Sequence, residues 1–297
     1  MIILTLSPLT GIGGPLHGAD NHPSVIPAAN DTEDDNNSDD GDAITGPKVM
    51  AHVNLAKTVR ESLVICLLCI YCYLSDIVGK RVYPDIVADE IDQPDFVDLI
   101  QRFLYEQCHS DSDSEAASSS TLSELPEFHG KISVCASAIA TFFAPSDISG
   151  IGGMRSERIR AVNIWRNGPG RYDTVFVSTN PMGEGMVSFD IARIKLFFSL
   201  KHEGVKYPCA LVHWYSRIGD SPDNNTGMWV VRPDVRDDET RFASVIHLDT
   251  IFRAAHLLPV YGNEFAPSYL NFSQSLDAFH SYYVNKYVDH HAFEIAF

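Results

Sequence analysis

Two tryptophans and a tyrosine stand close to an acidic segment in the second half of the chain. Trp214 and Tyr215 lie in an apolar run that is typical of a β-strand. Asp220 and Asp223 follow in a turn-rich segment, and Trp229 lies in the next apolar run. Because aromatic faces attract cations, and carboxylates add negative potential beside them, this group predicts a pocket for a lysine or methyl-lysine side chain of a protein partner. The alternative is that the aromatic side chains pack in the core of a β domain.

A second group of residues is rich in arginine. The segment 154–172 contains a single acidic residue, Glu157, together with Trp165 and the turn sequence Asn167–Gly170. Guanidinium groups bind phosphate oxygens, and aromatic rings support contact with nucleic acids, so this segment predicts a nucleic-acid-binding surface. The alternative is that the arginines pair with acidic residues elsewhere in the chain. The five arginines are Arg155, Arg158, Arg160, Arg166 and Arg171.

Side chains that could support catalysis do not form a complete set. His290 and Glu294 are four residues apart, but the remaining elements of a metalloprotease motif are missing, so we expect structural or capping roles for the segment Asp289–Glu294. Cys135 lies in an apolar run and is not a predicted nucleophile. We therefore expect no catalytic activity, no cofactor and no metal. A metal-dependent hydrolase or nuclease is the alternative, and Asp173 would be the first candidate ligand of a nuclease.

The charge of the chain is unevenly distributed. The 297 residues carry a net charge of −17, and 45% of them are hydrophobic. Residues 127–297 nevertheless contain eighteen acidic and sixteen basic side chains. The overall charge therefore does not exclude nucleic-acid binding by this part of the chain. Six cysteines are too few for a disulfide scaffold of this size, so we expect an intracellular, reducing environment.

Changes of composition divide the chain into four parts. Residues 1–49 are polar and acidic and are expected to be disordered. Residues 50–108 have a helical pattern, clearest in Asp95–Cys108, where apolar residues recur every three or four positions. Residues 109–126 form a predicted serine-rich and acidic linker. Residues 127–297 form the predicted β-rich domain, which is expected to fold without the first 108 residues.

One apolar run raises the question of a membrane. Leu63–Leu74 is shorter than the roughly 20 residues that a spanning helix needs, so we expect no membrane contact. Three cysteines repeat at every third position of this run, and we interpret them as small buried side chains on one helix face. They are Cys66, Cys69 and Cys72.

The predicted fold class is α+β, with a β-rich antiparallel sheet or small barrel, a small preceding helical segment and a C-terminal helix. The last helix is expected within Ser275–Phe297, with Ser273 as a cap and Leu276, Phe279 and Tyr283 as its apolar stripe. Strands are expected where β-branched and aromatic residues dominate between turn signals. The predicted strands are Lys131–Phe143, Asp173–Thr179, Val187–Leu200, Pro208–Ser216, Gly227–Val231 and Phe242–Leu248.

Six segments of the second half of the chain have a distinctive sequence, namely Ala144–Met154, Trp165–Asp173, Cys209–Arg217, Thr226–Trp229, His247–Val260 and Tyr283–Phe297. They resemble the C-terminal region of transposon-encoded proteins of mushroom-forming fungi, of the Plavaka or KDZ type. The likeness extends from about Leu99 to the C-terminus, whereas Val59–Tyr83 departs from the family pattern. The larger family members carry their transposase region upstream, so the resemblance adds a remnant transposase nuclease to the enzymatic alternative.

A second likeness is to the bromo-adjacent-homology (BAH) module, a β-rich protein-binding fold associated with chromatin. It implies a nuclear, non-catalytic interaction module whose partner is a basic protein or peptide such as a histone tail. The expected contacts are then Trp214, Tyr215, Asp220, Asp223 and Trp229, with the arginines of 155–171 as the nucleic-acid alternative. The matching segments are Val212–Arg217, Trp229–Val231, Ser244–Ile251 and His256–Val260.

Overall fold

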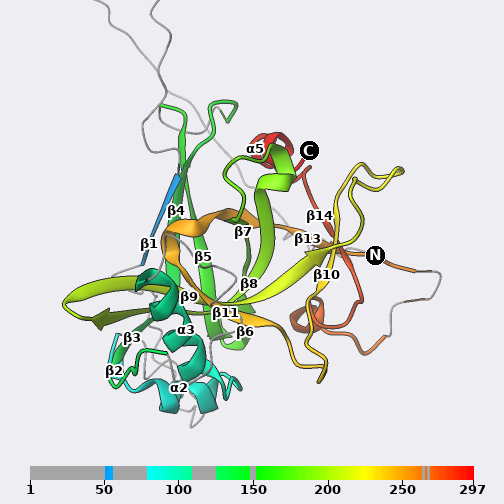
Figure 1. Cartoon of the computed structure of the whole chain (residues 1–297). Coiled ribbons are helices and arrows are strands. Elements are labelled where there is room, and N and C mark those ends of the chain that lie inside the picture. The colour runs from blue at the N-terminus through cyan, green and yellow to red at the C-terminus, as the bar shows by residue number, and fades with distance from the viewer. Residues whose placement is uncertain (1–50, 56–78, 109–124, 148–151, 263–264, 266–267) are drawn as a thin grey trace, which may run out of the picture. The chain divides into compact units, whose positions relative to one another are not determined.

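The computed structural model describes residues 51–55, 79–108, 125–147, 152–262, 265 and 268–297 (Figure 1). These residues are mainly antiparallel strands with a few short helices, which confirms the predicted α+β, β-rich class. The predicted tail (1–49), the apolar run Leu63–Leu74 and most of the predicted linker (109–126) lie outside the described residues.

Strands β7, β8 and β9 are the centre of a ten-stranded sheet. The order of its main path is β12-β7-β8-β9-β10-β14-β13, with β11 paired to β9, and with β3 paired to both β8 and β2. β8 and β9 are the longest pair and form a hairpin. The strand bounds are β2 Arg81–Val82, β3 Ile132–Cys135, β7 Thr174–Ser178, β8 Phe189–His202, β9 Val205–Arg217, β10 Val230–Pro233, β11 Ala243–His247, β12 Ile251–Ala255, β13 Leu257–Pro259 and β14 Tyr282–Val284.

A four-stranded sheet has the order β1-β4-β5-β6. Its strands are β1 Ala51–Leu55, β4 Ser137–Phe143, β5 Met154–Trp165 and β6 Gly168–Tyr172. β3 and β4 were expected as one strand, and a single residue, Ala136, separates them. β3 pairs within the larger sheet and β4 within the smaller one, so one continuous segment joins both sheets.

The two sheets share a hydrophobic core. Ala140 and Ile159 from the smaller sheet pack with Ile194, Ala210 and Val212 from the larger one, and all five are fully buried. Side chains alternate across a strand, so the odd-numbered neighbours on β9 face the other side of the sheet. This alternation gives the larger sheet two buried faces.

Two helices cover part of the second face. α2 (Pro84–Glu90) and α3 (Phe96–Cys108) lie together, and α3 contacts β11 (Figure 1). Phe96 stacks edge-on against Phe198 at 5.3 Å, and Ile100 and Leu104 are buried in the same cluster. The helix predicted at Asp95–Cys108 is therefore present. This helix supplies part of the core of residues 127–297, which were expected to fold alone.

The C-terminal segment covers another part of that face. It contains a short 3₁₀ turn (Phe272–Gln274), then β14, and finally the helix α5 (His290–Ile295). Tyr282 is buried beside Tyr215, whose ring centroid is 5.9 Å away. The C-terminal helix is thus shorter than the segment predicted from Ser275. Tyr282 and Tyr283 pair with β10 as a strand, although the sequence pattern around them is helical.

Candidate functional site

An open cavity of about 760 Å³ lies beside the end of β9. Four of the five residues predicted to bind a protein partner line it, namely Trp214, Tyr215, Asp220 and Trp229. β9 supplies the first two, the loop after it supplies Asp220, and the residue just before β10 supplies Trp229. Antiparallel pairing of β9 with β10 brings these segments together, because Val231 lies opposite Arg217.

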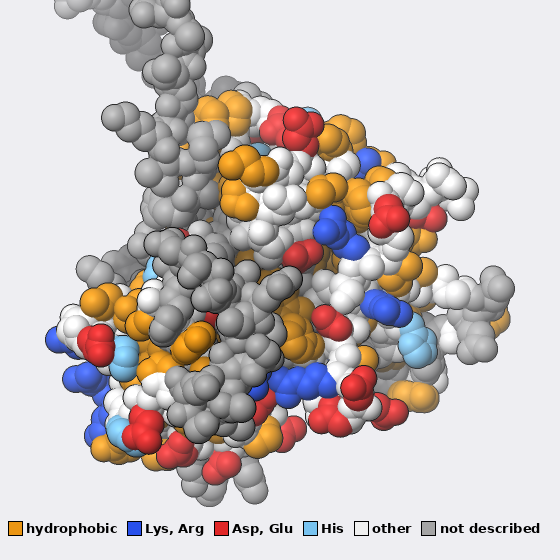
Figure 2. All heavy atoms as spheres, viewed as in Figure 1, with side chains coloured by type: hydrophobic (Ala, Val, Ile, Leu, Met, Phe, Trp, Pro, Cys, Tyr) orange, Lys and Arg blue, Asp and Glu red, His pale blue; other side chains and the backbone are white. Residues whose placement is uncertain are grey.

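Carboxylates outnumber cations around this pocket. Asp190, Asp220 and Asp234 line it together with one cation, Arg217. Arg217 lies 3.8 Å from Asp190, whereas neither Asp220 nor Asp234 has an ion-pair partner among the described residues. On the face shown in Figure 2, by contrast, acidic and basic side chains are intermixed. We call this cavity the acidic pocket.

The aromatic residues of the acidic pocket differ in exposure. Trp214 is half-buried, and its indole N–H donates to the Ser244 hydroxyl at 2.6 Å. Trp229 is only 5% exposed, and its indole N–H donates to the carbonyl of Phe297. Tyr215 is 2% exposed. Trp229 follows a polar loop, but it is buried because the C-terminal segment covers it.

Arg217 already lies over the Trp229 ring, where a cation of the partner would bind. Its guanidinium carbon lies 5.9 Å from the centre of the Trp229 ring. A second cation on that ring would be repelled by Arg217. Trp214 and Phe242, which is 43% exposed, are the more accessible aromatic walls of the acidic pocket.

Asp223 is the predicted residue that does not line the acidic pocket. Its carboxylate accepts hydrogen bonds from the backbone N–H of Asn225 and from the N–H and hydroxyl of Thr226. The bonds from Thr226 are the main cause that lowers the pKa of Asp223. Asp223 therefore stabilises its own turn, as aspartate commonly does.

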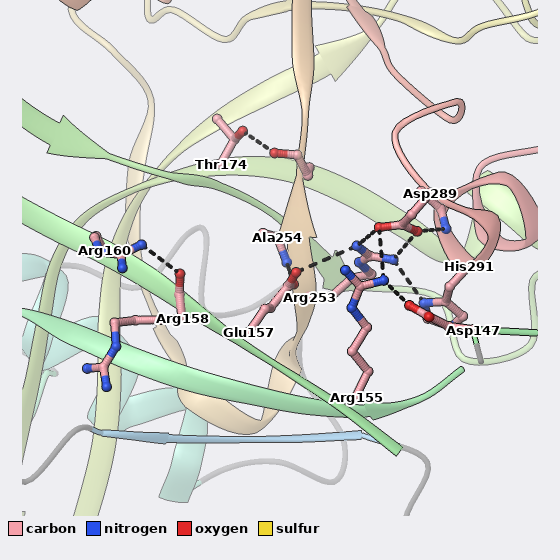
Figure 3. A network of polar contacts seen from close by, with 12 residues as sticks. Asp147, Arg155, Glu157, Arg158, Arg160, Thr174, Arg253, Ala254, Asp289 and His291 are labelled. Carbon is pink, nitrogen blue, oxygen red and sulfur yellow. Dashed lines mark hydrogen bonds and ion pairs between the residues drawn. The ribbon is translucent and has the colours of Figure 1, made fainter. Parts of the chain in front are cut away.

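The five arginines of segment 155–171 separate into two groups. Arg155 forms ion pairs with Asp147 and Asp289 beside a buried network around Arg253 (Figure 3). Figure 3 shows Arg158 and Arg160 lying away from that network along β5. The alternation of the strand explains the difference, because Arg155 and Glu157 are on the same face as the buried Ile159.

Three of the other four arginines gather near Trp165, and Arg158 lies close enough to Arg160 for the two charges to interact. The guanidinium carbons of Arg160, Arg166 and Arg171 lie 4.5, 5.4 and 5.5 Å from the centre of the Trp165 ring. Burial, and then the charge of Arg171, are the largest causes that lower the pKa of Arg160; Arg158 and Arg166 add to this effect, and Asp173 opposes it. We call Arg158, Arg160, Trp165, Arg166 and Arg171 the arginine hairpin.

Asp289 and His291 have structural roles at the C-terminus. Asp289 accepts a hydrogen bond from the backbone N–H of Ala292 and so caps α5. The same carboxylate binds Arg253 through two bonds of 2.9 and 2.6 Å. His291 is 4% exposed, stacks on Phe142 at 4.9 Å and lies 3.1 Å from Arg253. Through Asp289 and His291, the segment Asp289–Glu294 holds the C-terminus against the core.

The candidate catalytic and metal-binding residues do not converge. Within the described residues, no group of three or more histidines, cysteines, aspartates or glutamates could hold a metal ion. Asp173 binds the Arg171 side chain at 2.7 Å and the Arg160 backbone N–H at 2.9 Å. Burial raises the pKa of the Cys135 thiol. No helix in the described part of the chain is long and apolar enough to span a membrane.

Sequence reasoning missed three charged residues of the acidic pocket. Asp190 is the second residue of β8, and Asp234 directly follows β10. These carboxylates lie near Trp214 only because β8 and β10 both pair with β9. Arg217 was visible next to the predicted strand, but its pairing with Asp190 depends on register. A hairpin prediction that fixed the β8–β9 register would have found this pair.

Comparisons with known proteins identify no relative: no family model, no curated protein and no solved structure matches this chain.

Proposed function

We propose that this protein is a non-catalytic interaction module that binds a basic segment of a partner protein in the acidic pocket. The observation that carries the proposal is the pair Asp220 and Asp234, which line one cavity with Trp214 and have no cationic partner among the described residues. A lysine or arginine side chain satisfies these carboxylates with charge-assisted hydrogen bonds. Its aliphatic stem packs on the aromatic wall.

Ion pairing, and not an aromatic cage, is the main attraction in this mechanism. Trp229 and Tyr215 are buried and form the floor of the pocket, and Arg217 lies over the ring of Trp229. The resemblance to BAH modules makes histone tails in the nucleus the first partners to examine. A methyl-lysine preference requires an accessible ring face, and Trp214 is the residue that would provide it.

A fluorescein-labelled peptide with four lysines among eight residues tests the proposal by anisotropy with the full chain. Asp220→Asn combined with Asp234→Asn removes both unpaired carboxylates, and we expect at least a tenfold loss of affinity. Asp89→Asn is the matched control, because Asp89 is exposed on α2 and contributes nothing to the pocket. An equal loss in both variants, or wild-type binding by the double variant, would refute the proposal.

A second candidate function is enzymatic, but no described cluster favours it. The nucleic-acid alternative is different, because the arginine hairpin offers a specific arrangement of its own.

A further inference from the structure

The arginine hairpin is a preformed element. β5 and β6 pair up to Trp165 and Gly168, and the two residues between them, Arg166 and Asn167, have φ angles of 50° and 60°. Two central residues with positive φ are the mark of the type I′ turn, which matches the twist of a two-stranded hairpin. The turn therefore holds Arg166 beside Trp165.

Trp165 organises the guanidinium groups into one cluster. The guanidinium carbons of Arg160, Arg166 and Arg171 are within 5.5 Å of the same ring centre. They are thus within about 11 Å of one another, a span over which one strand of B-form DNA, with a rise of ~3.4 Å per phosphate, presents about three phosphates. Stacking on the ring reduces the side-chain entropy that binding would otherwise cost.

The cluster has a positive charge that its surroundings do not neutralise. Asp173 pairs with Arg171, but Arg158, Arg160 and Arg166 have no ion-pair partner among the described residues. Arg158 donates only to the Ser137 hydroxyl, and Arg160 to a backbone carbonyl. Like charges at this spacing repel one another, so an anion with several negative groups would relieve the repulsion.

We propose that the arginine hairpin is a second binding site, which takes the phosphate backbone of a nucleic acid. Each guanidinium presents a planar pair of donors that matches two phosphate oxygens. Three guanidinium groups already lie within 5.5 Å of the centre of the Trp165 ring, which leaves little of the ring for a base to stack on. Contact is therefore with the backbone and is independent of base sequence.

The experiment measures anisotropy of the full chain with a labelled 20-nucleotide DNA, single-stranded in one arm and duplex in the other, from 50 to 200 mM salt. Arg158→Gln with Arg166→Gln removes two exposed charges without breaking a described ion pair. We expect at least a tenfold weaker affinity at 50 mM salt. The slope of log affinity against log salt should flatten by about 1.8 for duplex and about 1.4 for single-stranded DNA.

A matched control lies in the other long hairpin. Lys201 and Lys206 are exposed and opposite each other on β8 and β9, next to a turn in which Glu203 and Gly204 also have positive φ. Lys201→Gln with Lys206→Gln removes the same charge and should leave both the affinity and the salt slope unchanged.

Two outcomes would overturn this site. They are no DNA binding by the wild-type chain at 50 mM salt and an equal loss of affinity in the lysine control. Circular dichroism must show wild-type unfolding temperatures for both double variants. The Asp220→Asn, Asp234→Asn variant should bind DNA at least as well as wild type, which separates this site from the acidic pocket.

Discussion

Arg253 is the most deeply buried ion-paired arginine of the described residues. Its side chain is 3% exposed and contacts Asp289, Glu157, His291 and the ring of Phe142. These partners come from β4, β5 and the C-terminal segment, so a single side chain joins three separate parts of the fold (Figure 3).

Replacing Arg253 with methionine should destabilise the protein strongly. The change preserves much of the apolar packing but leaves Asp289 and Glu157 without their buried cation, which typically costs about 3–5 kcal/mol. Urea unfolding at pH 7 measures the loss. Arg217→Met is the control, because the partly exposed Arg217–Asp190 pair is worth about 1 kcal/mol or less. Similar losses in the two variants would contradict this role of Arg253.

The two tryptophans of the acidic pocket should respond differently to truncation. Trp229→Ala removes a 95% buried indole from a packed cluster and should cost about 3–5 kcal/mol of unfolding free energy. Trp214→Ala removes a half-buried side chain and should cost less while weakening peptide binding. Thermal and urea unfolding of both variants measures this difference. A larger loss at Trp214 would show that it is the structural residue of the pair.

At the scale of elements, α3 determines which fragment can fold. Its apolar face covers Phe198 and Leu211, so residues 127–297 alone would expose part of their own core. We expect the fragment 50–297 to unfold cooperatively and the fragment 127–297 to bind a hydrophobic dye and melt without a sharp transition. Calorimetry of both fragments checks this. A cooperative transition of the shorter fragment would show that α3 is dispensable.

Residue type predicted the central strands well and the flanking elements poorly. β7, β8, β9 and β11 are rich in valine, isoleucine, phenylalanine and tyrosine, and each lies where a strand was predicted. β5 and β6 were missed, because the charged half of β5 lacks a run of β-branched and aromatic residues and the sequence Gly168–Gly170 of β6 is typical of turns. Their pairing depends on Arg166 and Asn167 adopting positive φ, which asparagine tolerates well but which is uncommon for arginine.

The candidate site was predictable only where neighbours in sequence are neighbours in space. Trp214, Tyr215 and Asp220 lie on consecutive parts of one strand and loop, and they line the same pocket. The burial of Trp229 depends on Phe297, which is 68 residues away. Local patterns contain no information on such a contact.

At the scale of the whole molecule, the half-buried His213 and the buried His291 make stability depend on pH. Burial, and then Lys195, Arg241 and Arg193, lower the pKa of His213 to about 3. Burial, and then Arg253, lower the pKa of His291 to about 4, although Glu294 and Asp289 oppose this shift. Both side chains are therefore neutral in the folded protein at pH values where the unfolded chain binds a proton.

The stability that depends on these neutral histidines should be fully present above pH 6.5. It should fall as the pH decreases from 6.5 towards 4. In this window each histidine lowers the free energy of unfolding by up to about 1.4 kcal/mol per pH unit. Glu157 works in the opposite direction, because burial raises its pKa. Urea unfolding at pH 7, 6 and 5 measures the slope. His213→Gln should reduce it, whereas His129→Gln, at an exposed position, should not.

Ala136, the single residue between β3 and β4, affects how the two sheets can unfold. Ala136 links a strand of each sheet, and its carbonyl accepts a hydrogen bond from the N–H of Ala161. Neither sheet can separate from the shared core without pulling on the same covalent segment. Amide protons of β4 and of β8 should therefore exchange with deuterium at rates set by one common, global opening. The protein would then present its two charged surfaces on one cooperative unit, and a partner that stiffens one surface would slow exchange at the other.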